Sequence, residues 1–267
     1  MTDSIILQDR LLIEIEGLDR KKFLQGLITN DVNKATQKNL IYCAMLSASG
    51  RFLYDFFIFE IAEKLILDCL ALRRDEILQK LNFYKLRSQV TLKKNDDLQV
   101  CSNFSQGQFC DPRHPNLGFR SYIKSDSKQS MEAYNFKRIT LKIPESEQDL
   151  TYDKSFILEF GFDDLNAIDY QKGCYVGQEL TARTHYRGEI RKKLFHVKLD
   201  SKNPPEKNSE ITCEGKSAGI FLSSVFHESQ LHALALIKIT DDQDFSEKKE
   251  KLPSSLEFKG QKIFIIS

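Results

Sequence analysis

The sequence lacks the features that would direct a chain to a membrane or to nucleic acid. Its apolar runs fall well short of the ~18 residues that a membrane-spanning helix needs. The 39 basic and 38 acidic side chains leave a net charge of +1, so no overall field attracts nucleic acid or anionic lipid. The first residues contain neither a signal peptide pattern nor an Arg- and Ser-rich presequence. We therefore expect no membrane partner and no direct nucleic-acid partner.

Closely spaced cysteines are also missing. No CxxC pair and no zinc-finger or ferredoxin spacing occurs among the six cysteines, which are Cys43, Cys69, Cys101, Cys110, Cys174 and Cys213. In a chain of this size without a secretory signal, free thiols are expected. The chain therefore does not look able to hold an iron–sulfur cluster or a stable metal ion alone, although one thiolate could serve as a ligand of a shared cluster.

What is present is the composition of an ordinary folded protein. The chain has 267 residues, 41% of them hydrophobic, which is enough for one large domain or two to three smaller ones. Two helical patterns are present. One follows Asp19 and carries apolar residues from Phe23 to Ile28, and the other follows Asp75. Strand patterns occupy 10–16, 40–47, 52–60, 65–70 and 88–93. This order favours an α+β unit with helices on one face of a mostly antiparallel sheet. Residues 98–165 are less regular, and 131–142 fit either a helix or a strand.

The C-terminal part has a different character, with strand patterns and no good helix. These patterns occupy 193–199, 210–212, 218–226, 231–239 and 262–266. They predict a small all-β barrel or a sandwich. We place the boundary near 190, which gives an α+β region over 1–190, subdivided near 95, and a β-barrel over 191–267.

Residues 172–183 read KGCYVGQELTAR and are the most informative stretch of the chain. Cys174 follows Lys172 closely and precedes a helical pattern that runs from Val176 to about Tyr186. A cation and a helix N-terminus both stabilise a thiolate, so Cys174 is suited to act as a nucleophile, a soft metal ligand or a redox group. We therefore take Cys174 and Lys172 as the candidate catalytic pair. The rest of the motif is Gly173, Tyr175, Gly177, Gln178 and Glu179, of which the last two could equally serve to cap the helix.

The pattern KGCY-x-GQE resembles the signature of the YgfZ family, folate-binding proteins that maintain iron–sulfur enzymes and share a fold with the glycine-cleavage T-protein, an aminomethyltransferase. The continuation to Lys192 looks most like the mitochondrial and alphaproteobacterial branch. This resemblance implies an α+β fold: a T-protein-like ring of two α+β domains plus a C-terminal all-β barrel around a central folate channel. It also implies tetrahydrofolate or a derivative as the cofactor, and iron–sulfur assembly proteins or client enzymes as partners.

Further stretches resemble the same family. They include FLQG-x-x-TNDV at 23–32, GR-x-x-x-D at 50–55, Y-x-LR at 84–87, and DPR followed by LG-aromatic-R within 111–120. One departure concerns the second stretch, where T-proteins have two adjacent acids and this chain has Tyr54 and Asp55. T-proteins also lack the motif cysteine. Both differences argue against simple aminomethyl transfer.

The folate contacts that the resemblance implies are best assigned to acids. Leu158-Glu159 and Asp164-Leu165, ahead of the cysteine motif, resemble the segment that carries the folate-contacting glutamate in T-proteins. The resemblance therefore makes Glu159 the first candidate and Asp55 the second, and a carboxylate suits this role because it accepts two N–H bonds from the edge of a reduced pterin. Either could instead be an ordinary surface acid. Asn30, Tyr54 and Arg51 complete the predicted folate-binding set, although Asn30 could equally bond its own backbone in a turn.

Basic residues gather around the cysteine motif. Between Gln171 and Lys198 there are seven Lys or Arg residues and only two acids. Arg183 and Arg187 are four apart and share a helix face. This basic rim could hold a folate polyglutamate tail, guide an acidic protein partner, contact RNA phosphates, or be a solvated face. RNA is the weakest of these alternatives, since no stacking aromatic repeat accompanies the charge.

Three functions remain open from the sequence. The first is a folate-dependent factor that assembles or repairs four-iron proteins through Cys174 and so supports tRNA modification indirectly. The second is a tetrahydrofolate-dependent aminomethyltransferase or demethylase, which would not need the thiol. The third is a non-catalytic adaptor that docks iron–sulfur scaffold proteins through the basic rim. The expected location is the bacterial cytoplasm, or the mitochondrial matrix in a eukaryote.

Overall fold

The structure is a computed structural model and describes residues 4–125, 129–188, 190–241, 250–251, 253 and 255–266. The chain forms two units, each assembled from three stretches of sequence. The first consists of Met1–Met131, Tyr152–Ser155 and Phe162–Ala182, and the second of Glu132–Thr151, Phe156–Gly161 and Arg183–Ser267. The two units are therefore interleaved along the chain.

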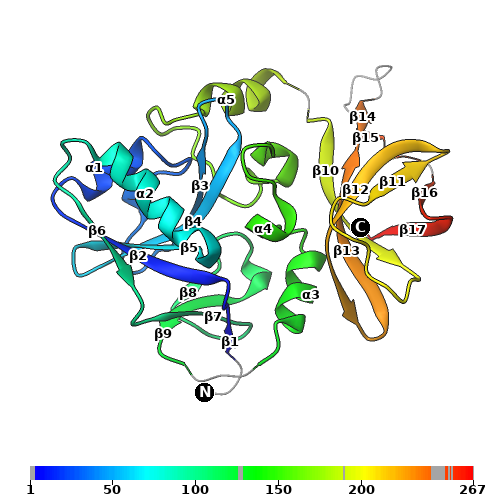
Figure 1. Cartoon of the computed structure of the whole chain (residues 1–267), viewed down its shortest axis with the longest axis horizontal. Coiled ribbons are helices and arrows are strands. Elements are labelled where there is room, and N and C mark those ends of the chain that lie inside the picture. Colours follow the sequence, from blue (N-terminus) through cyan, green and yellow to red (C-terminus); the bar gives the residue numbers. More distant parts are fainter. Residues whose placement is uncertain are drawn as a thin grey trace. The chain divides into compact units, whose positions relative to one another are not determined.

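A five-stranded antiparallel sheet lies at the centre of the first unit, in the order β3-β4-β5-β2-β6 (Figure 1). Its strands are β2 (Arg10–Glu16), β3 (Ile41–Leu46), β4 (Phe52–Ile61), β5 (Lys64–Leu70) and β6 (Thr91–Asn95). All of β3 and most of β4 are buried, as expected for strands covered on both faces. The five strand patterns predicted from the sequence all form strands. The last begins at Thr91, because residues 88–90 form a turn in which Val90 N donates to Ser88 O.

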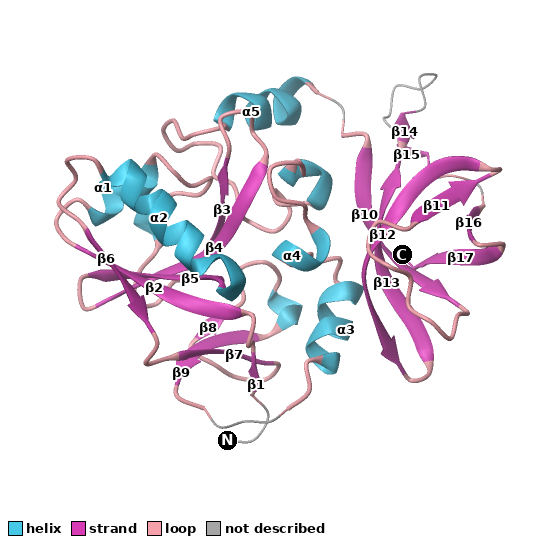
Figure 2. Ribbon diagram, viewed as in Figure 1, coloured by secondary structure: helices cyan, strands magenta, loops and turns pink. Residues whose placement is uncertain are grey.

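Two helices, α1 (Arg20–Gln25) and α2 (Arg74–Lys85), pack on this sheet. Figure 2 shows α2 crossing in front of its strands. The helices bury apolar side chains in a common core, namely Phe23, Leu24, Ile77 and Leu81. The helical pattern extended to Ile28, but α1 ends at Gln25 and Leu27 and Ile28 are buried in the turn that follows. The carbonyls of Gln25 and Ile28 accept hydrogen bonds from Lys172, far along the chain, in place of helical N–H groups.

A second sheet forms mainly within residues 98–165, where the sequence shows no regular pattern. Its order is β1-β7-β9-β8, with β1 (Ile5–Ile6), β7 (Gln99–Asn103), β8 (Phe109–Cys110) and β9 (Phe119–Ile123). Strands of two to five residues are too short to show a convincing alternation of apolar and polar residues, so the sequence did not predict them.

A closed barrel of six strands forms most of the second unit and confirms the predicted C-terminal barrel (Figure 2). Its order is β10-β13-β12-β11-β16-β17, and pairing of β10 with β17 closes it. The strands are β10 (Lys192–Leu199), β11 (Glu210–Cys213), β12 (Lys216–His227), β13 (Gln230–Lys238), β16 (Leu256–Phe258) and β17 (Gln261–Ile266). Five of these were predicted, and β16 was missed because three residues carry too little pattern. Next to them, β14 (Thr240–Asp241) pairs with β15 (Glu250–Lys251).

Helices complete both units. The ambiguous stretch 131–142 contains α3 (Glu132–Thr140), which packs against β12 and β13. The others are α4 (Ser146–Asp149), α5 (Gln178–Arg187) and four single turns, η1 (Val32–Lys34), η2 (Ala71–Arg73), η3 (Pro115–Leu117) and η4 (Ile157–Phe160).

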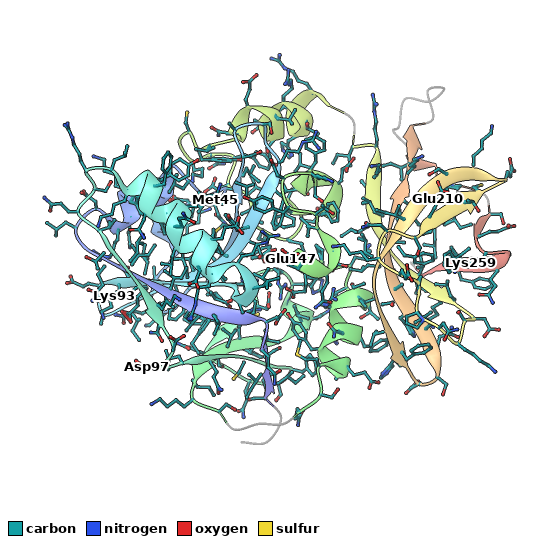
Figure 3. All side chains as sticks on the ribbon, viewed as in Figure 1. Met45, Lys93, Asp97, Glu147, Glu210 and Lys259 are labelled. Atoms are coloured by element: carbon teal, nitrogen blue, oxygen red, sulfur yellow. The ribbon has the colours of Figure 1, made fainter. Side chains whose placement is uncertain are left out.

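The side chains divide in the usual way between core and solvent. In Figure 3, Met45 of β3 lies among packed side chains, whereas Lys93 and Asp97 lie at the edge. Within the described ranges, the helices are all too short or too polar to cross a membrane.

Candidate functional site

The cysteine motif forms an exposed loop in front of helix α5. The side chain of Cys174 is exposed, and its neighbour Tyr175 is buried. The helix begins at Gln178, two residues later than the pattern predicted, because Gly177 has a left-handed backbone with φ +82. The helix dipole acts most strongly at the first helical turn. Cys174 lies ahead of that turn, which begins at Gln178. What the structure gives this thiol is exposure on a loop that is fixed on both sides.

Lys172 fixes the first side of the loop. Its ammonium group donates hydrogen bonds to three backbone carbonyls, at 2.7 Å to Gln25 O, 2.6 Å to Ile28 O and 2.9 Å to Asn30 O. Carbonyls at and after the end of a helix have no helical partner, and a cation satisfies them well. Burial lowers the pKa of Lys172 to about 8, so the side chain remains charged at neutral pH. With its three N–H groups engaged in this way, Lys172 is a positioning residue and does not direct its charge at the thiol as the sequence suggested.

The backbone continues this attachment. Val176 N donates to Gly26 O at 3.1 Å, and Asp169 N donates to Thr29 O at 3.0 Å. The hydroxyl group of Thr29 donates to Ala167 O at 2.6 Å. The stretch FLQG-x-x-TNDV is thus the platform on which the segment leading to Cys174 lies, which explains why the two motifs occur together in one chain.

Asn30 belongs to this platform. Its amide nitrogen donates to Tyr42 O and to Asn166 O, both at 2.8 Å, and its amide oxygen accepts from Asp31 N at 2.8 Å. The side chain is therefore fully used in joining three segments of the chain. The turn interpretation of Asn30 describes this geometry better than a direct folate contact does.

Two glycines fix the second side of the loop. Gly177 lies against the hairpin turn between β3 and β4, where a Cβ atom would come within 2.4 Å of Ser47 O. Gly50, at the tip of that turn, has φ +72, and its own Cβ would lie 3.2 Å from Gly177 O. Only residues without a side chain allow these two backbones to approach so closely. The motifs around Gly50 and Cys174 therefore meet directly.

Two predicted folate contacts lie on this hairpin and already have protein partners. The guanidinium of Arg51 donates to Lys154 O at 2.6 Å. The hydroxyl of Tyr54 donates to the carboxylate of Glu76 at 2.6 Å, and burial raises the pKa of Tyr54 far above its ordinary value. Both residues thus connect the hairpin to neighbouring segments of the first unit.

Asp55, the second predicted pterin acid, lies in a buried network of charges. Its carboxylate accepts from the guanidinium of Arg10 at 3.1 Å and from the hydroxyl of Tyr42 at 3.1 Å. Arg10 also pairs with Asp68 at 2.6 Å. With its side chain 1% exposed, Asp55 could reach a ligand only if this network opened.

The DPR and LG-aromatic-R stretches supply the rest of the network. Arg120 bridges Asp68 at 2.9 Å and Asp111 at 3.4 Å, and Arg113 pairs with Asp111 at 3.0 Å. Burial alone would raise the pKa of Asp111, but the two guanidinium groups bring it below its ordinary value. The guanidinium of Arg120 lies 3.7 Å from the centre of the Phe57 ring. Three arginines and three aspartates thus balance one another inside the first unit.

The remaining predicted site residues lie on η4 and α5. Glu159 is half-buried in η4, between the buried side chains of Leu158 and Phe160. Arg183 and Arg187 are exposed on successive turns of α5, with Glu179 in its first turn. Glu189, one of the two acids of the basic rim, lies outside the described residues.

A cavity that the sequence did not reveal lies in the first unit, with a volume of about 440 Å³. It is of the size that small-molecule sites have. Its lining is mixed: polar Asn30, Tyr42, Asp111 and Asn166 alternate with apolar side chains such as Leu40 and Phe109. Lys34, Lys38 and the exposed Cys110 also line it, and the ammonium group of Lys34 pairs with Asp169 at 2.8 Å. No sequence signal pointed to Lys38 or Cys110, since neither lies in a motif.

Comparison with known proteins supplies relatives of this chain. No family model matches the sequence. The "Iron-sulfur cluster assembly factor IBA57 homolog, mitochondrial" of Pyricularia oryzae is 30% identical, over 82% of this chain and 68% of the relative. That of Neurospora crassa is 30% identical, over 71% of this chain and 52% of the relative. The mouse protein, "Iron-sulfur cluster assembly factor IBA57, mitochondrial", is 29% identical, over 83% of this chain and 74% of the relative.

A solved structure shows the fold. The glycine cleavage system aminomethyltransferase T from Bartonella henselae superposes with a TM-score of 0.70, covering 100% of this chain and 86% of that one. The sequence identity is 12%, so the likeness concerns the fold alone. The T-protein fold expected from the sequence is confirmed.

Proposed function

This chain belongs to the family of IBA57 iron–sulfur cluster assembly factors, and from that premise we propose that it assists the assembly or repair of four-iron proteins through the thiol of Cys174. The observation that carries the proposal is the exposed thiol on a loop held from both sides, by Lys172 and by Gly177. The YgfZ-like cysteine motif belongs to the same proposal.

A fixed, exposed thiol is suited to meet an iron atom that another protein presents. After losing its proton to solvent, Cys174 would donate a thiolate ligand to a cluster iron, and a rigid loop reduces the entropy lost on binding. One ligand is too few to hold a cluster, which takes four. Among the described residues, no group of three His, Cys, Asp or Glu side chains is placed to bind a metal ion. The cluster is therefore treated as shared cargo, and the partner would supply the remaining ligands.

Tetrahydrofolate or a derivative belongs to the proposal as a cofactor. The T-protein fold and the cavity of about 440 Å³ with lysines at its lining support it. When bound, a reduced folate supplies a carrier for one-carbon units or a reductant. Glu159 remains the candidate that the family resemblance implies for the pterin edge, although it belongs to the second unit and does not line this cavity. Arg51, Tyr54, Asp55 and Asn30 are assigned here to shaping the first unit around the cavity and the cysteine loop.

The alternative is a tetrahydrofolate-dependent aminomethyltransferase, which the shared fold favours. The pairing of Asp55 with Arg10 speaks against it, because a transferase needs a free carboxylate beside the pterin.

The adaptor hypothesis rests on the exposed Arg183 and Arg187. Iron–sulfur assembly proteins or client enzymes are the proposed partners, tRNA modification would be supported indirectly, and the proposed location is the bacterial cytoplasm or the mitochondrial matrix.

Complementation tests the proposal. Wild type, Cys174→Ser and the control Cys213→Ser would be expressed in a bacterium that lacks its own family member, and a four-iron enzyme would be assayed. Cys213 is the matched control because it is a free, partly exposed cysteine on β11 of the barrel, outside the cysteine loop and the cavity. We expect wild type and Cys213→Ser to restore the activity and Cys174→Ser, equally abundant, to fail. Equal activity of all three would show that the thiol is dispensable and would favour the adaptor.

A further inference from the structure

Leu86, in the Y-x-LR stretch, is held in a conformation that leucine avoids. It follows the last residue of α2 with φ +44 and ψ −111, and its side chain is 88% exposed. A non-glycine residue with positive φ is strained, and such strain persists only where the surrounding structure imposes it. A large apolar side chain pushed into solvent by a strained backbone contributes nothing to the fold. It is a feature to be explained by binding.

Leu86 is one of several apolar side chains gathered at one place. It lines a groove of about 810 Å³, whose other lining residues are Asp19, Lys22, Phe23, Leu27, Tyr84, Arg87 and Ser88. Leu18 is 86% exposed and Phe83 is 76% exposed. Leu18 lies close to the groove because its neighbour Asp19 lines it and accepts from Gln89 N at 2.7 Å. Clustered exposed apolar residues of this kind mark interaction sites in soluble proteins.

The surroundings of the groove are positively charged. In the described part of the chain, Lys22, Lys85 and Arg87 form no ion pair with a carboxylate, whereas the neighbouring Arg20 and Lys21 both pair with Glu60. The only acid in the lining is Asp19, whose carboxylate is bonded to Gln89 N. Three cations against one carboxylate leave an excess of positive charge around the groove, which favours an acidic partner.

The groove is lined in part by the platform that holds the cysteine loop. Phe23 on α1 and Leu27 in the turn after it line the groove, and the carbonyls of Gln25 and Ile28 beside them accept from Lys172. Val176, two residues after the thiol, packs against the core that contains both. A protein held in the groove would therefore contact the platform that carries Cys174.

From these observations we propose that the groove between α1 and α2 docks a partner protein through an acidic, amphipathic segment whose apolar side chains enter beside Leu86. The concave shape, with buried Phe23 and Leu27 at its wall, suits inserted side chains and a helix-in-groove mode of binding. A membrane surface would contact only the tips of the exposed apolar side chains and would not enter the groove. The proposal does not depend on the chemistry at Cys174.

The test begins with a random dodecapeptide display library selected on the whole protein and counter-selected on the variant L86G/R87E. Leu86→Gly removes the apolar side chain and relieves the strained backbone, so its thermal midpoint should equal or exceed that of wild type. We expect the selected peptides to combine large apolar residues with Asp or Glu. Their synthetic versions, measured by fluorescence anisotropy, should bind L86G/R87E at least about tenfold more weakly than wild type.

Two matched controls isolate the groove. Leu72→Gly removes another leucine, 80% exposed in the turn η2 that precedes α2, and Lys202→Glu reverses an exposed charge on the second unit. Both should bind the peptides as wild type does. Selection of basic or uncharged peptides, or equal binding to all variants, would overturn the proposal. So would binding of wild type to vesicles of phosphatidylcholine and phosphatidylserine, or a Leu86-dependent dimer in size-exclusion chromatography.

Because Leu86→Gly and Cys174→Ser probe different sites, failure of one proposal leaves the other intact. A thiol-dependent protein with no peptide preference would retain the proposed function and lose only the docking groove. A protein that binds acidic peptides but does not need Cys174 would retain the groove.

Discussion

Gly50 and Gly177 meet backbone to backbone: a Cβ atom built on Gly177 would lie 3.2 Å from the Cα atom of Gly50. The two residues are 127 positions apart in the sequence, and both have positive φ. Their contact joins the hairpin of the five-stranded sheet to the loop that presents Cys174. The orientation of the thiol thus depends on two positions at which a side chain is not tolerated.

Replacing Gly177 by alanine should therefore disturb the loop. The new Cβ would lie 2.4 Å from Ser47 O on a backbone with φ +82, so we expect a loss of about 1–3 kcal/mol in the free energy of unfolding. Urea unfolding measures it. Gly173→Ala is the control in the same motif, because its Cβ would meet nothing within 4 Å. Equal stability of the two variants would contradict the close contact.

Asp55 should behave as a structural counter-ion. Asp55→Asn leaves the buried guanidinium of Arg10 with Asp68 as its remaining carboxylate, and disruption of a buried ion pair costs about 3 kcal/mol. We expect a fall of that order in the free energy of unfolding. If stability is unchanged and folate affinity measured by calorimetry falls instead, Asp55 is a ligand of the pterin as first expected from the sequence.

The exposed and the buried cysteines should separate by reactivity. Cys110 and Cys174 are exposed, Cys43, Cys69 and Cys101 are buried, and Cys213 is intermediate. Burial raises the pKa of Cys69 to about 12 and that of Cys43 beyond its ordinary range, so neither forms a thiolate at neutral pH. We expect iodoacetamide to modify Cys110 and Cys174 in the native protein and the three buried thiols only after unfolding, as read by peptide mass spectrometry. Native labelling of Cys43 would refute this assignment.

The barrel should lose stability in mild acid through a histidine pair. The ring nitrogens of His196 and His232 lie 2.8 Å apart, and burial together with His232 and Lys198 lowers the pKa of His196 from 6.5 to about 4. Between these values the unfolded chain binds a proton that the folded chain does not. The free energy of unfolding therefore falls as the pH drops through that window.

His196→Gln provides the comparison for this effect. It removes the titrating group, so the difference in unfolding free energy between pH 7 and pH 4.5 should be smaller in the variant than in wild type. Urea unfolding at the two pH values measures it. Carboxylates contribute the same amount to both proteins, and an identical loss in both would assign the acid sensitivity to them alone.

Sequence patterns predicted those parts of the fold that depend on local order. The strands around Ile13, Cys43 and Phe57, and five of the six barrel strands, were found because their apolar runs are long enough to show periodicity. The four-stranded sheet was not found, because strands such as β8 have two residues. The end of α1 was misplaced for a different reason, since Lys172 determines it from far along the chain.

The site residues likewise divide into those that the local sequence predicts and those whose role depends on distant contacts. The motif identified the exposed Cys174, and the positive φ of Gly177 follows from its being glycine. The roles of Asp55 and Tyr54 were not predictable, because Arg10 and Glu76 lie 45 and 22 residues away in sequence. A motif indicates which residue types recur together, but only the folded chain determines which side chain each of them meets.

The hydrogen bonds of Lys172 also set an order of events during synthesis. They close loops of 147, 144 and 142 residues, so the turn after α1 leaves the ribosome long before the ammonium group that completes it. Contacts so distant in sequence form late in folding, after the loop-closure entropy has been overcome. A nascent or truncated chain therefore lacks an organised cysteine loop, and the loop takes its shape only once the first unit, which extends to Ala182, has been made in full.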